Sequence, residues 1–169
     1  MKRLRPVDLV GVAVATCLLA TDQFSKWLVV HNVRIHESIQ VIPGLLNITH
    51  VRNTGAAFGI LSSPEPGLRS SLLLGFSLLA LGFILWVWFR ERPTSRLQVI
   101  SLAMVLGGAL GNLVDRVRLG QVIDFLDFYW RQYHWPAFNV ADSAVTVGVI
   151  LFLLGLMNAP RKEGGPMAS

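Results

Sequence analysis

Three long stretches of this chain contain no charged residue, and they constrain its fold more than any other feature. Residues 70–89 form an uncharged run of 20 residues, and residues 97–114 and 143–160 form runs of 18 each. A helix rises about 1.5 Å per residue, so each run can span the roughly 30 Å hydrocarbon core of a bilayer. A fourth run, residues 9–21, has only 13 residues. Its helix reaches spanning length only if it continues through Asp22 and Lys26 to about Val30.

The overall composition agrees with a membrane protein of one domain. The chain has 169 residues, of which 53% are hydrophobic, and its mean hydropathy is +0.54. We predict an all-α membrane protein with a small β element, built as a four-helix transmembrane bundle in a single domain, residues 1–169. The expected spans are about residues 7–30, 69–89, 97–118 and 139–158. The expected outer segments are about 31–68 and 119–138, and residues 160–169 are expected to form a disordered tail.

The positions of the basic residues predict the orientation of the bundle. Lysines and arginines crowd the region before the first run, the short connection after the second, and the region after the fourth. By contrast, residues 31–67 contain only Arg34 and Arg52, and residues 119–138 contain only Arg131. Short cytoplasmic loops carry the excess of positive charge, so both termini are expected in the cytoplasm. The net charge of +5 is thereby explained as a topology signal, and no nucleic-acid partner is expected.

The two outer segments have patterns of their own. Residues 35–60 combine β-branched residues with turn signals such as Pro-Gly and Asn-Thr-Gly, which predicts a small extracytoplasmic sheet. Residues 122–136 are aromatic and amphipathic, which indicates an interfacial strand or short helix.

Polar residues from distant parts of the chain are expected at one depth, the outer membrane–water boundary. In the predicted orientation, the first and third helices end there and the fourth begins there. Ionisable groups in a membrane are costly, so their convergence indicates a site. The residues concerned are Asp22, Lys26, Asn112, Asp115, Arg116, Asp124, Asp127, Asn139 and Asp142.

Several of these residues also have a purely structural interpretation. Asn139 could cap the fourth helix, with Asp142 completing the cap and favouring the helix dipole. Asp22 and Lys26 are four residues apart and could form an ion pair within one helix, which could also brace a site.

Other positions are interpreted mainly as structural. Gly107 and Gly111 form a small-xxx-small pair that lets helices approach closely, and Gly55 follows Asn53-Thr54 in what could be only a turn. The histidines show no metal-ligand spacing and are expected at the surface or interface, and the lone Cys17 is expected to be a buried, inert thiol. We therefore expect no metal and no cofactor.

The residues at the outer boundary favour one kind of hydrolytic chemistry. A serine triad lacks a positioned histidine, Cys17 lies within an apolar run, and the zinc motif H-E-x-x-H is absent. What remains is a pair of carboxylates, Asp124 and Asp142, from two segments that meet at this boundary. Two nearby carboxylates do not both ionise easily, so one can act as a base towards water while the other donates a proton.

These residues lie in motifs that resemble those of a known family, the lipoprotein signal peptidases, or type II signal peptidases of bacteria. The similar stretches follow one another from the first helix to the fourth and cover most of the chain. They are DQFSK (22–26), RNTGAAFG (52–59), GGALGNLVDRV (107–117), VIDFLD (122–127) and FNVADS (138–143).

The resemblance implies a multi-pass aspartic endopeptidase of the bacterial cytoplasmic (inner) membrane, with its active site at the extracytoplasmic face. Such an enzyme removes the signal peptide from diacylglyceryl-modified prolipoproteins, cleaving before the lipidated cysteine, and is inhibited by the cyclic peptide globomycin. Asp124 and Asp142 match the catalytic pair. The positions expected to support the site or bind substrate are Asp22, Lys26, Asn53, Gly55, Asn112, Arg116 and Asn139. The expected partners are the prolipoprotein and membrane lipids, and a monomer suffices.

Two alternatives remain open from the sequence. A small proton-coupled four-helix transporter would also carry membrane carboxylates, although transporters place them near the midplane and often show repeat symmetry. A non-enzymatic assembly factor packed through its glycines would leave the co-located acids unexplained.

Overall fold

The computed structural model describes residues 5–55, 66–93 and 95–157. Within them, four helices are long and apolar enough to cross a membrane. They are α1 (Pro6–Asn32), α2 (Pro66–Glu91), α3 (Arg96–Leu119) and α4 (Val140–Met157). The four predicted spans are thus confirmed as helices. The first continues without interruption through Asp22 and Lys26, as its length required.

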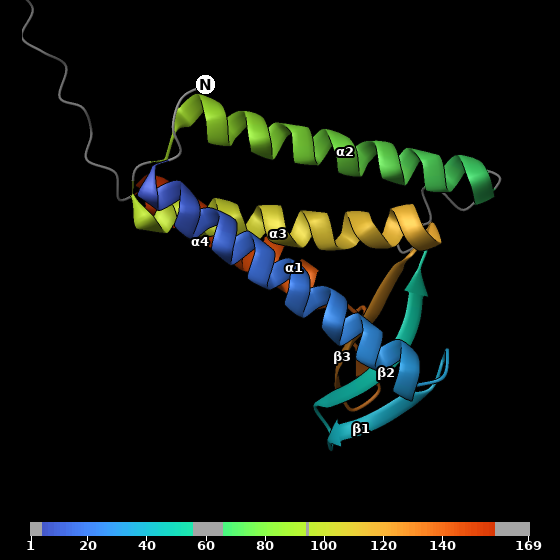
Figure 1. Ribbon diagram of the computed structural model, residues 1–169. Helices are drawn as coiled ribbons and strands as arrows, with labels where there is room; N and C mark the ends of the chain where they lie inside the picture. Colours follow the sequence, from blue (N-terminus) through green and yellow to red (C-terminus); the bar gives the residue numbers. More distant parts are fainter. Residues whose placement is uncertain (1–4, 56–65, 94, 158–169) are drawn as a thin grey trace, which may run out of the picture.

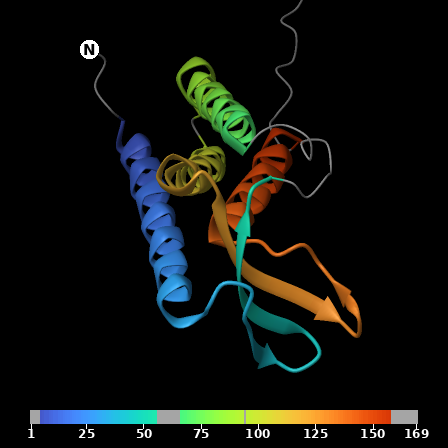
Figure 2. The same ribbon diagram turned by 90° about the vertical axis from the view of Figure 1, so that its right-hand side faces the viewer.

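Helix α3 is the centre of the bundle. It packs against α1, α2 and α4, whereas α2 makes its main contacts with α3 (Figures 1 and 2). The N-terminus of α3 is capped by Ser95, whose side chain accepts a hydrogen bond from the backbone N–H of Gln98, and its C-terminus ends at Gly120 with φ +68°. Many side chains on the outer faces of the helices are exposed and apolar, as expected for surfaces that face lipid.

Glycines allow α3 to approach its two main neighbours closely. A Cβ atom on Gly107 would lie 2.8 Å from the backbone oxygen of Ala15 in α1, and one on Gly108 would collide with the backbone oxygen of Ala141 in α4. The predicted packing role of this glycine-rich stretch is confirmed, since only a residue without a side chain permits these separations.

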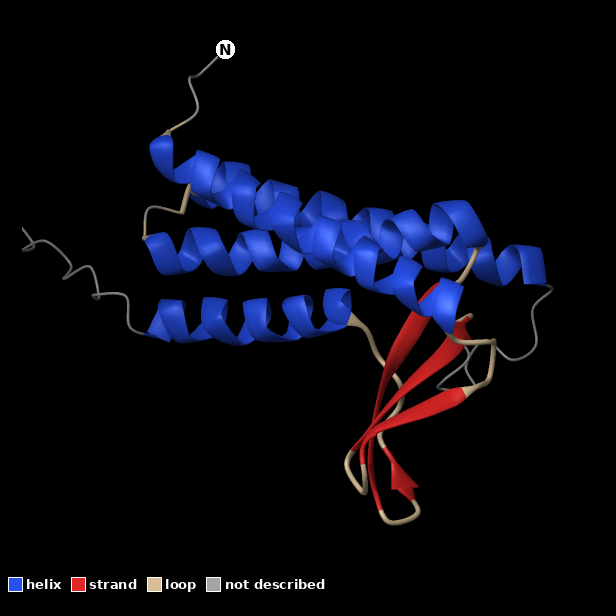
Figure 3. Ribbon diagram, turned by 60° about the horizontal axis from the view of Figure 1, so that its bottom comes forward, coloured by secondary structure: helices blue, strands red, loops and turns tan. Residues whose placement is uncertain are grey.

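A small antiparallel sheet lies at one end of the bundle (Figure 3). Its strands are β1 (Ser38–Ile42), β2 (Leu46–Asn53), β3 (Val122–Trp130) and β4 (Tyr133–His134), in that spatial order. Strand β2 pairs with β3, and this pairing places Val51 opposite Asp124. The second outer segment is therefore a strand and not a helix. Val29 and Val33 of the α1 end pack with Phe125 of β3 and fix the sheet to the bundle.

The described part of the chain contains four helices, an even number, so the start of α1 and the end of α4 lie at the same end of the bundle. The first turn of α1 and the last turn of α4 lie at the end of the bundle away from the sheet (Figure 3). The cytoplasmic position of the termini stays a prediction. Residues 56–65, which include part of the first outer segment, and the predicted tail 160–169 lie outside the described residues.

Two predictions about single residues were wrong. His50 is not at the surface: it is 2% exposed, and its Nδ1 lies 2.9 Å from the backbone oxygen of Val33. It fills the space between the end of α1 and the sheet, which the sequence pattern around it did not reveal. Cys17 is exposed rather than buried, because it lies in an open apolar groove between α1 and α3 that also involves Ile100 and Met104.

Candidate active site

The start of α4 is organised by a reciprocal pair of hydrogen bonds. The backbone N–H of Asp142 donates to Oδ1 of Asn139 at 2.9 Å, and the backbone N–H of Asn139 donates to Oδ2 of Asp142 at 3.3 Å. This is a capping box, which satisfies two N–H groups that a helix end leaves free. The predicted cap is confirmed, and it fixes the carboxylate of Asp142 at the sheet end of the bundle.

Asp124 reaches the same place from the sheet. It lies near the start of β3 and is 2% exposed. The amide of Asn139 donates to its Oδ1 at 2.7 Å, and the amide of Asn53 in β2 donates to its Oδ2 at 2.9 Å. Each carboxylate oxygen thus has a neutral donor, and the group has no cation in direct contact among the described residues.

Asn112 of α3 joins the two aspartates through side chains. Its amide nitrogen donates to Oδ1 of Asp142 at 2.7 Å, and its amide oxygen accepts from Nδ2 of Asn139 at 3.2 Å. A continuous path of hydrogen bonds therefore runs from Asp124 through Asn139 and Asn112 to Asp142. The two acids belong to one polar network, although β3 and α4 bring them from different parts of the chain.

Lys26 joins this network through the side chain of Asn112. Its Nζ lies 2.8 Å from Asp22 and 2.8 Å from Asp115, and it donates to the oxygen of Asn112 at 3.0 Å. The ammonium group is 2% exposed and its two acidic partners are buried to a similar degree. All three donor protons of the lysine are thereby used, which a buried charge requires.

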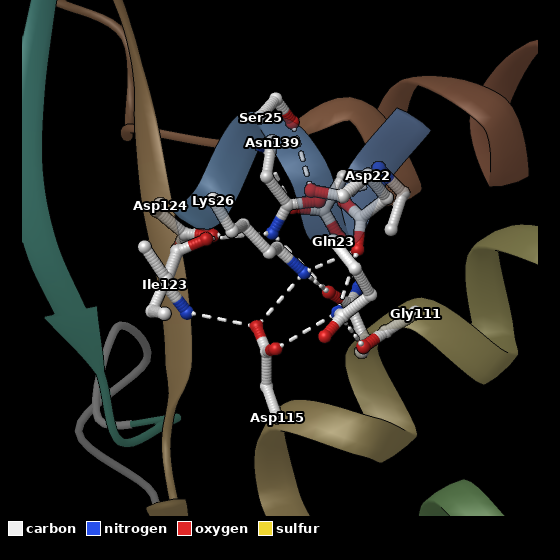
Figure 4. A network of polar contacts seen from close by, with 12 residues as sticks. Asp22, Gln23, Ser25, Lys26, Gly111, Asp115, Ile123, Asp124 and Asn139 are labelled. Atoms are coloured by element: carbon white, nitrogen blue, oxygen red, sulfur yellow. Dashed lines mark hydrogen bonds and ion pairs between the residues drawn. The ribbon is translucent and has the colours of Figure 1, made fainter. Parts of the chain in front are cut away.

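The acids around Lys26 also bind the backbone of the elements that carry the catalytic candidates. Asp22 accepts from the backbone N–H of Ala141 at 2.9 Å, and Asp115 accepts from that of Ile123 at 3.2 Å. Figure 4 shows Asp22 and Lys26 of α1, Asp115 of α3 and Ile123 of β3 converging. Because Ala141 precedes Asp142 and Ile123 precedes Asp124, the cluster fixes both aspartates in position.

Sequence reasoning missed two members of the network. Asp115 was placed at this boundary but was not included among the site residues, and Gln23 was not singled out at all. The amide of Gln23 donates to Asp115 at 3.0 Å and to the backbone oxygen of Gly111 at 3.1 Å. A usable signal existed for Asp115: an acid at the end of an apolar helix needs a cation, and Lys26 was available at the same depth.

The two remaining predicted residues lie at the edge of the network. Arg116 is half-buried, and its guanidinium is 3.4 Å from the backbone oxygen of Asn112. Gly55 has φ +73°, and its backbone N–H donates to the side-chain oxygen of Asn53 at 2.7 Å. The turn thereby orients the Asn53 amide towards Asp124. The structure brings all the predicted site residues together, while their roles stay predictions.

Burial dominates the electrostatics of Asp124. Desolvation and, to a smaller extent, the nearby negative charge of Asp142 raise the pKa of its carboxyl, whereas the hydrogen bonds from Asn53 and Asn139 lower it; the net result is a rise from 3.8 to about 6. A carboxyl with such a pKa exchanges its proton near neutral pH, which suits acid–base chemistry.

An open cavity of about 340 Å³ borders Asp124. Its walls come from the end of β2, including Asn53, and from Pro136 and Ala137 before α4. A peptide could reach Asp124 from this side. Among the described residues, no group of three or more His, Cys, Asp or Glu side chains is placed to hold a metal ion.

Comparison with known proteins identifies the family. Residues 14–158 match the family model of signal peptidase (SPase) II. The lipoprotein signal peptidase of Syntrophotalea carbinolica is 48% identical over 141 residues, which cover 83% of this chain and 86% of the relative. That of Geobacter sulfurreducens is 44% identical over 160 residues, covering 95% of this chain and 99% of the relative.

Solved structures agree. A bacterial membrane enzyme determined by the in meso method at 2.3 Å superposes with a TM-score of 0.78 at 31% identity, covering 95% of this chain and 94% of the other. A second, at 1.9 Å, gives a TM-score of 0.77 at 32% identity and covers 89% of this chain and 94% of the other.

The fold and the matches define a membrane-embedded peptidase of bacteria. The chain belongs to the signal peptidase II family. The family predicted from the sequence motifs is thereby confirmed, and with it the prediction that the chain cleaves signal peptides. None of these matches supports the transporter alternative.

Proposed function

We propose that Asp124 and Asp142 are the catalytic pair of an aspartic endopeptidase that removes the signal peptide from diacylglyceryl-modified prolipoproteins. The observation that carries this proposal is the path of hydrogen bonds that joins the two carboxylates through Asn139 and Asn112. The substrate class follows from family membership, because the relatives are lipoprotein signal peptidases.

The chemistry follows from two acids in one buried network. One carboxylate is ionised and takes a proton from a water molecule as that water attacks the carbonyl carbon before the lipidated cysteine. The other is protonated, donates a hydrogen bond to the carbonyl oxygen, and later passes its proton to the leaving nitrogen. The pair titrates as a unit, so the two roles are not assigned to fixed residues. No covalent intermediate or metal is needed.

The depth of the aspartates suits a lipid-anchored substrate. They lie where the apolar helices meet the sheet, which we place at the extracytoplasmic face of the cytoplasmic membrane, with both termini in the cytoplasm. The diacylglyceryl chains of the substrate can then remain in the bilayer, whereas extracting them would cost about 0.8 kcal/mol per buried CH₂ group. The sheet, which includes the aromatic strand β3, would cover the peptide and limit the access of water.

The remaining site residues divide into three roles. Asp22 and Asp115 are positioning residues, since each binds the backbone next to one catalytic aspartate, and Lys26 holds the two acids together. Asn53, Asn112 and Asn139 orient the carboxylates themselves. Arg116 and Gly55 lie at the edge of the network, beside Asn112 and Asn53, and are assigned to substrate binding.

The proposal is tested by replacing each acid with its neutral isostere. Asp124→Asn and Asp142→Asn are each expected to lower the cleavage rate of a diacylglyceryl-prolipoprotein by about 10²–10⁴-fold, the usual contribution of a positioned acid or base. The matched control is Asp127→Asn. Asp127 is on the same strand and is also buried, but its partners are Asn47 and His134. Cleavage is followed by the mobility of the product on a gel.

Two results would contradict the catalytic assignment. One is a folded Asp124→Asn or Asp142→Asn variant that cleaves at the wild-type rate. The other is an equal loss in Asp127→Asn, which would mean that the assay responds to any lost charge on the outer face. Globomycin is expected to block cleavage by Asp127→Asn and by the unmodified enzyme alike.

A further inference from the structure

A second cavity borders the polar network away from Asp124, between the last turns of α1 and α3. It has a volume of about 150 Å³, and Gln23, Lys26 and Asp115 form the wall that it shares with the network. Arg52, Arg118 and Trp27 also line it. We call it the α1–α3 cavity. Asp124, Asp142 and Asn53 do not line it, so it is separate from the proposed peptide site.

The cavity concentrates positive charge that the described residues do not neutralise. Among them, neither Arg52 nor Arg118 has a hydrogen-bonding or ion-pair partner for its guanidinium. Asp115 is the acid in the wall, but its oxygens already bind Lys26, Gln23 and the backbone N–H of Ile123. Two unpaired guanidinium groups around one small cavity repel each other, and an anion between them would remove this repulsion.

The other side of the cavity is apolar and continuous with the lipid-facing surface. Trp27 is 52% exposed and Leu119 is 40% exposed. Tryptophan prefers the boundary between the acyl chains and the headgroups.

Along α1, the face that carries Gln23 continues towards the middle of the bilayer. Leu19, Thr16 and Val12 precede Gln23 in the chain at intervals of three or four residues and therefore lie on the same side of the helix. Thr16 and Val12 are exposed on this face and Leu19 is half-buried. Since none of the three is charged, acyl chains can lie along this face.

We propose that the α1–α3 cavity binds the phosphate group of an anionic phospholipid. Arg52 and Arg118 hold the phosphate through charge-assisted hydrogen bonds, and the acyl chains lie along the exposed face of α1. The charge favours an anionic lipid over a zwitterionic one, because the cation of a zwitterionic headgroup would face two arginines. The adjoining apolar surface favours a lipid over free phosphate.

The test measures bound lipid directly and does not depend on peptidase activity. The purified protein in neutral maltoside micelles is titrated with phosphatidylglycerol or phosphatidylcholine, and retained lipid is counted by native mass spectrometry. The unmodified protein is expected to retain one phosphatidylglycerol at a concentration about tenfold lower than it requires for phosphatidylcholine. Arg118→Gln is expected to weaken the binding of phosphatidylglycerol by about tenfold or more, the effect of losing charge-assisted hydrogen bonds. Arg118 is chosen because Arg52 also borders the cavity beside Asp124.

The matched control is Arg34→Gln. Arg34 is also exposed and lies at the sheet end, between α1 and β1, but it does not line the cavity. It should leave the binding of phosphatidylglycerol unchanged. Arg52→Gln is measured in parallel, so that a folding defect in one variant leaves the other as the test.

Three outcomes would overturn the proposal. Both cavity variants could bind phosphatidylglycerol as the unmodified protein does. Arg34→Gln could lose as much binding as they do, which would indicate diffuse attraction to the surface. Inorganic phosphate could displace phosphatidylglycerol at equal concentration, which would assign the cavity to free phosphate.

Discussion

Asn139 binds Asp124 and at the same time caps the helix that carries Asp142. Its Nδ2 donates to Oδ1 of Asp124 at 2.7 Å, while its Oδ1 accepts from the backbone N–H of Asp142 at 2.9 Å. The residue is fully buried, so neither bond can be replaced readily by water. A single side chain thus caps the helix that carries Asp142 and sets the relative position of the two acids.

The first prediction separates these two roles. Asn139→Ala removes both bonds. The loss of the cap alone is expected to lower the free energy of unfolding by about 1 kcal/mol. The cleavage rate should fall by more than this loss of stability explains. Ser95→Ala is the matched control, because Ser95 caps α3 and touches neither aspartate. It should cost similar stability and leave cleavage nearly unchanged. Equal losses of cleavage in the two variants would reduce Asn139 to a helix cap. Unfolding midpoints and cleavage rates are measured in the same micelles.

The second prediction concerns the pH dependence of stability. The folded pKa of Asp124 is about 6, against 3.8 for the free carboxyl, chiefly because burial opposes its ionisation. Between these values the native state binds more protons than the unfolded state, so the contribution of Asp124 to stability is present at low pH and is lost as the pH rises through about 6. The side chain of Asp124→Asn cannot ionise, so this variant does not lose that stability as the pH rises.

The measurement is the unfolding midpoint of the unmodified protein and of Asp124→Asn from about pH 4 to about pH 7. The unmodified protein should lose stability relative to the variant across this range. Other carboxyl groups titrate in both proteins, so the difference isolates Asp124. A difference that stays constant with pH would mean that Asp124 has the same pKa in the folded and the unfolded protein, and a difference that grows in the opposite direction would mean that folding lowers the pKa; either would contradict the prediction.

Most of the fold could be predicted from the sequence, because a bilayer leaves few options for long uncharged runs. The helices and the outer sheet follow from run length and from β-branched and turn residues. The convergence of Asp22, Asn112, Asp124 and Asp142 also followed, since topology alone assigns each a depth.

The sequence revealed partners within one helix, such as Asn139 and Asp142, but not the partners that come from other elements. Asp22 and Lys26 were paired through their spacing, but Asp115 completes the pair from α3, and Gln23 joins it. The burial of His50 was missed for the same reason. Its neighbours are the end of α1 and its own strand, and contacts between elements leave no periodic trace in the sequence.

The third prediction tests the buried charges around Lys26. Lys26→Met leaves Asp22 and Asp115 buried without their cation and is expected to lower stability by about 3–5 kcal/mol. Adding Asp115→Asn should restore part of this loss, because one of the two unpaired charges is removed. Cleavage should fall as well, since both aspartates of the proposed pair depend on this cluster for position. The unfolding midpoint and the cleavage rate are the measurements.

The control for Lys26 is Arg5→Gln. Arg5 and Asp8 form an ion pair at the same distance, 2.8 Å, but the arginine side chain is 33% exposed. A pair whose cation is partly open to water contributes less than a fully buried one because water screens it, so this variant should lose much less stability than Lys26→Met. If Lys26→Met and Arg5→Gln were equally mild, the charges of Asp22 and Asp115 would have access to water that the structure does not give them.

The last prediction concerns the contact between α3 and α4. A Cβ on Gly108 would collide with the backbone oxygen of Ala141 and lie 2.8 Å from Cγ2 of Val145, so Gly108→Ala must push the helices apart and is expected to cost about 1–3 kcal/mol. Asn112 lies one turn further along α3, and its 2.7 Å bond to Asp142 should lengthen, so cleavage should fall as well. Gly75→Ala in α2 adds the same methyl where no atom lies within 4 Å; since alanine favours a helix more than glycine does, the midpoint should stay unchanged or rise slightly. A midpoint that falls equally in both variants would trace the loss to the added methyl group itself rather than to the close contact of α3 with α4.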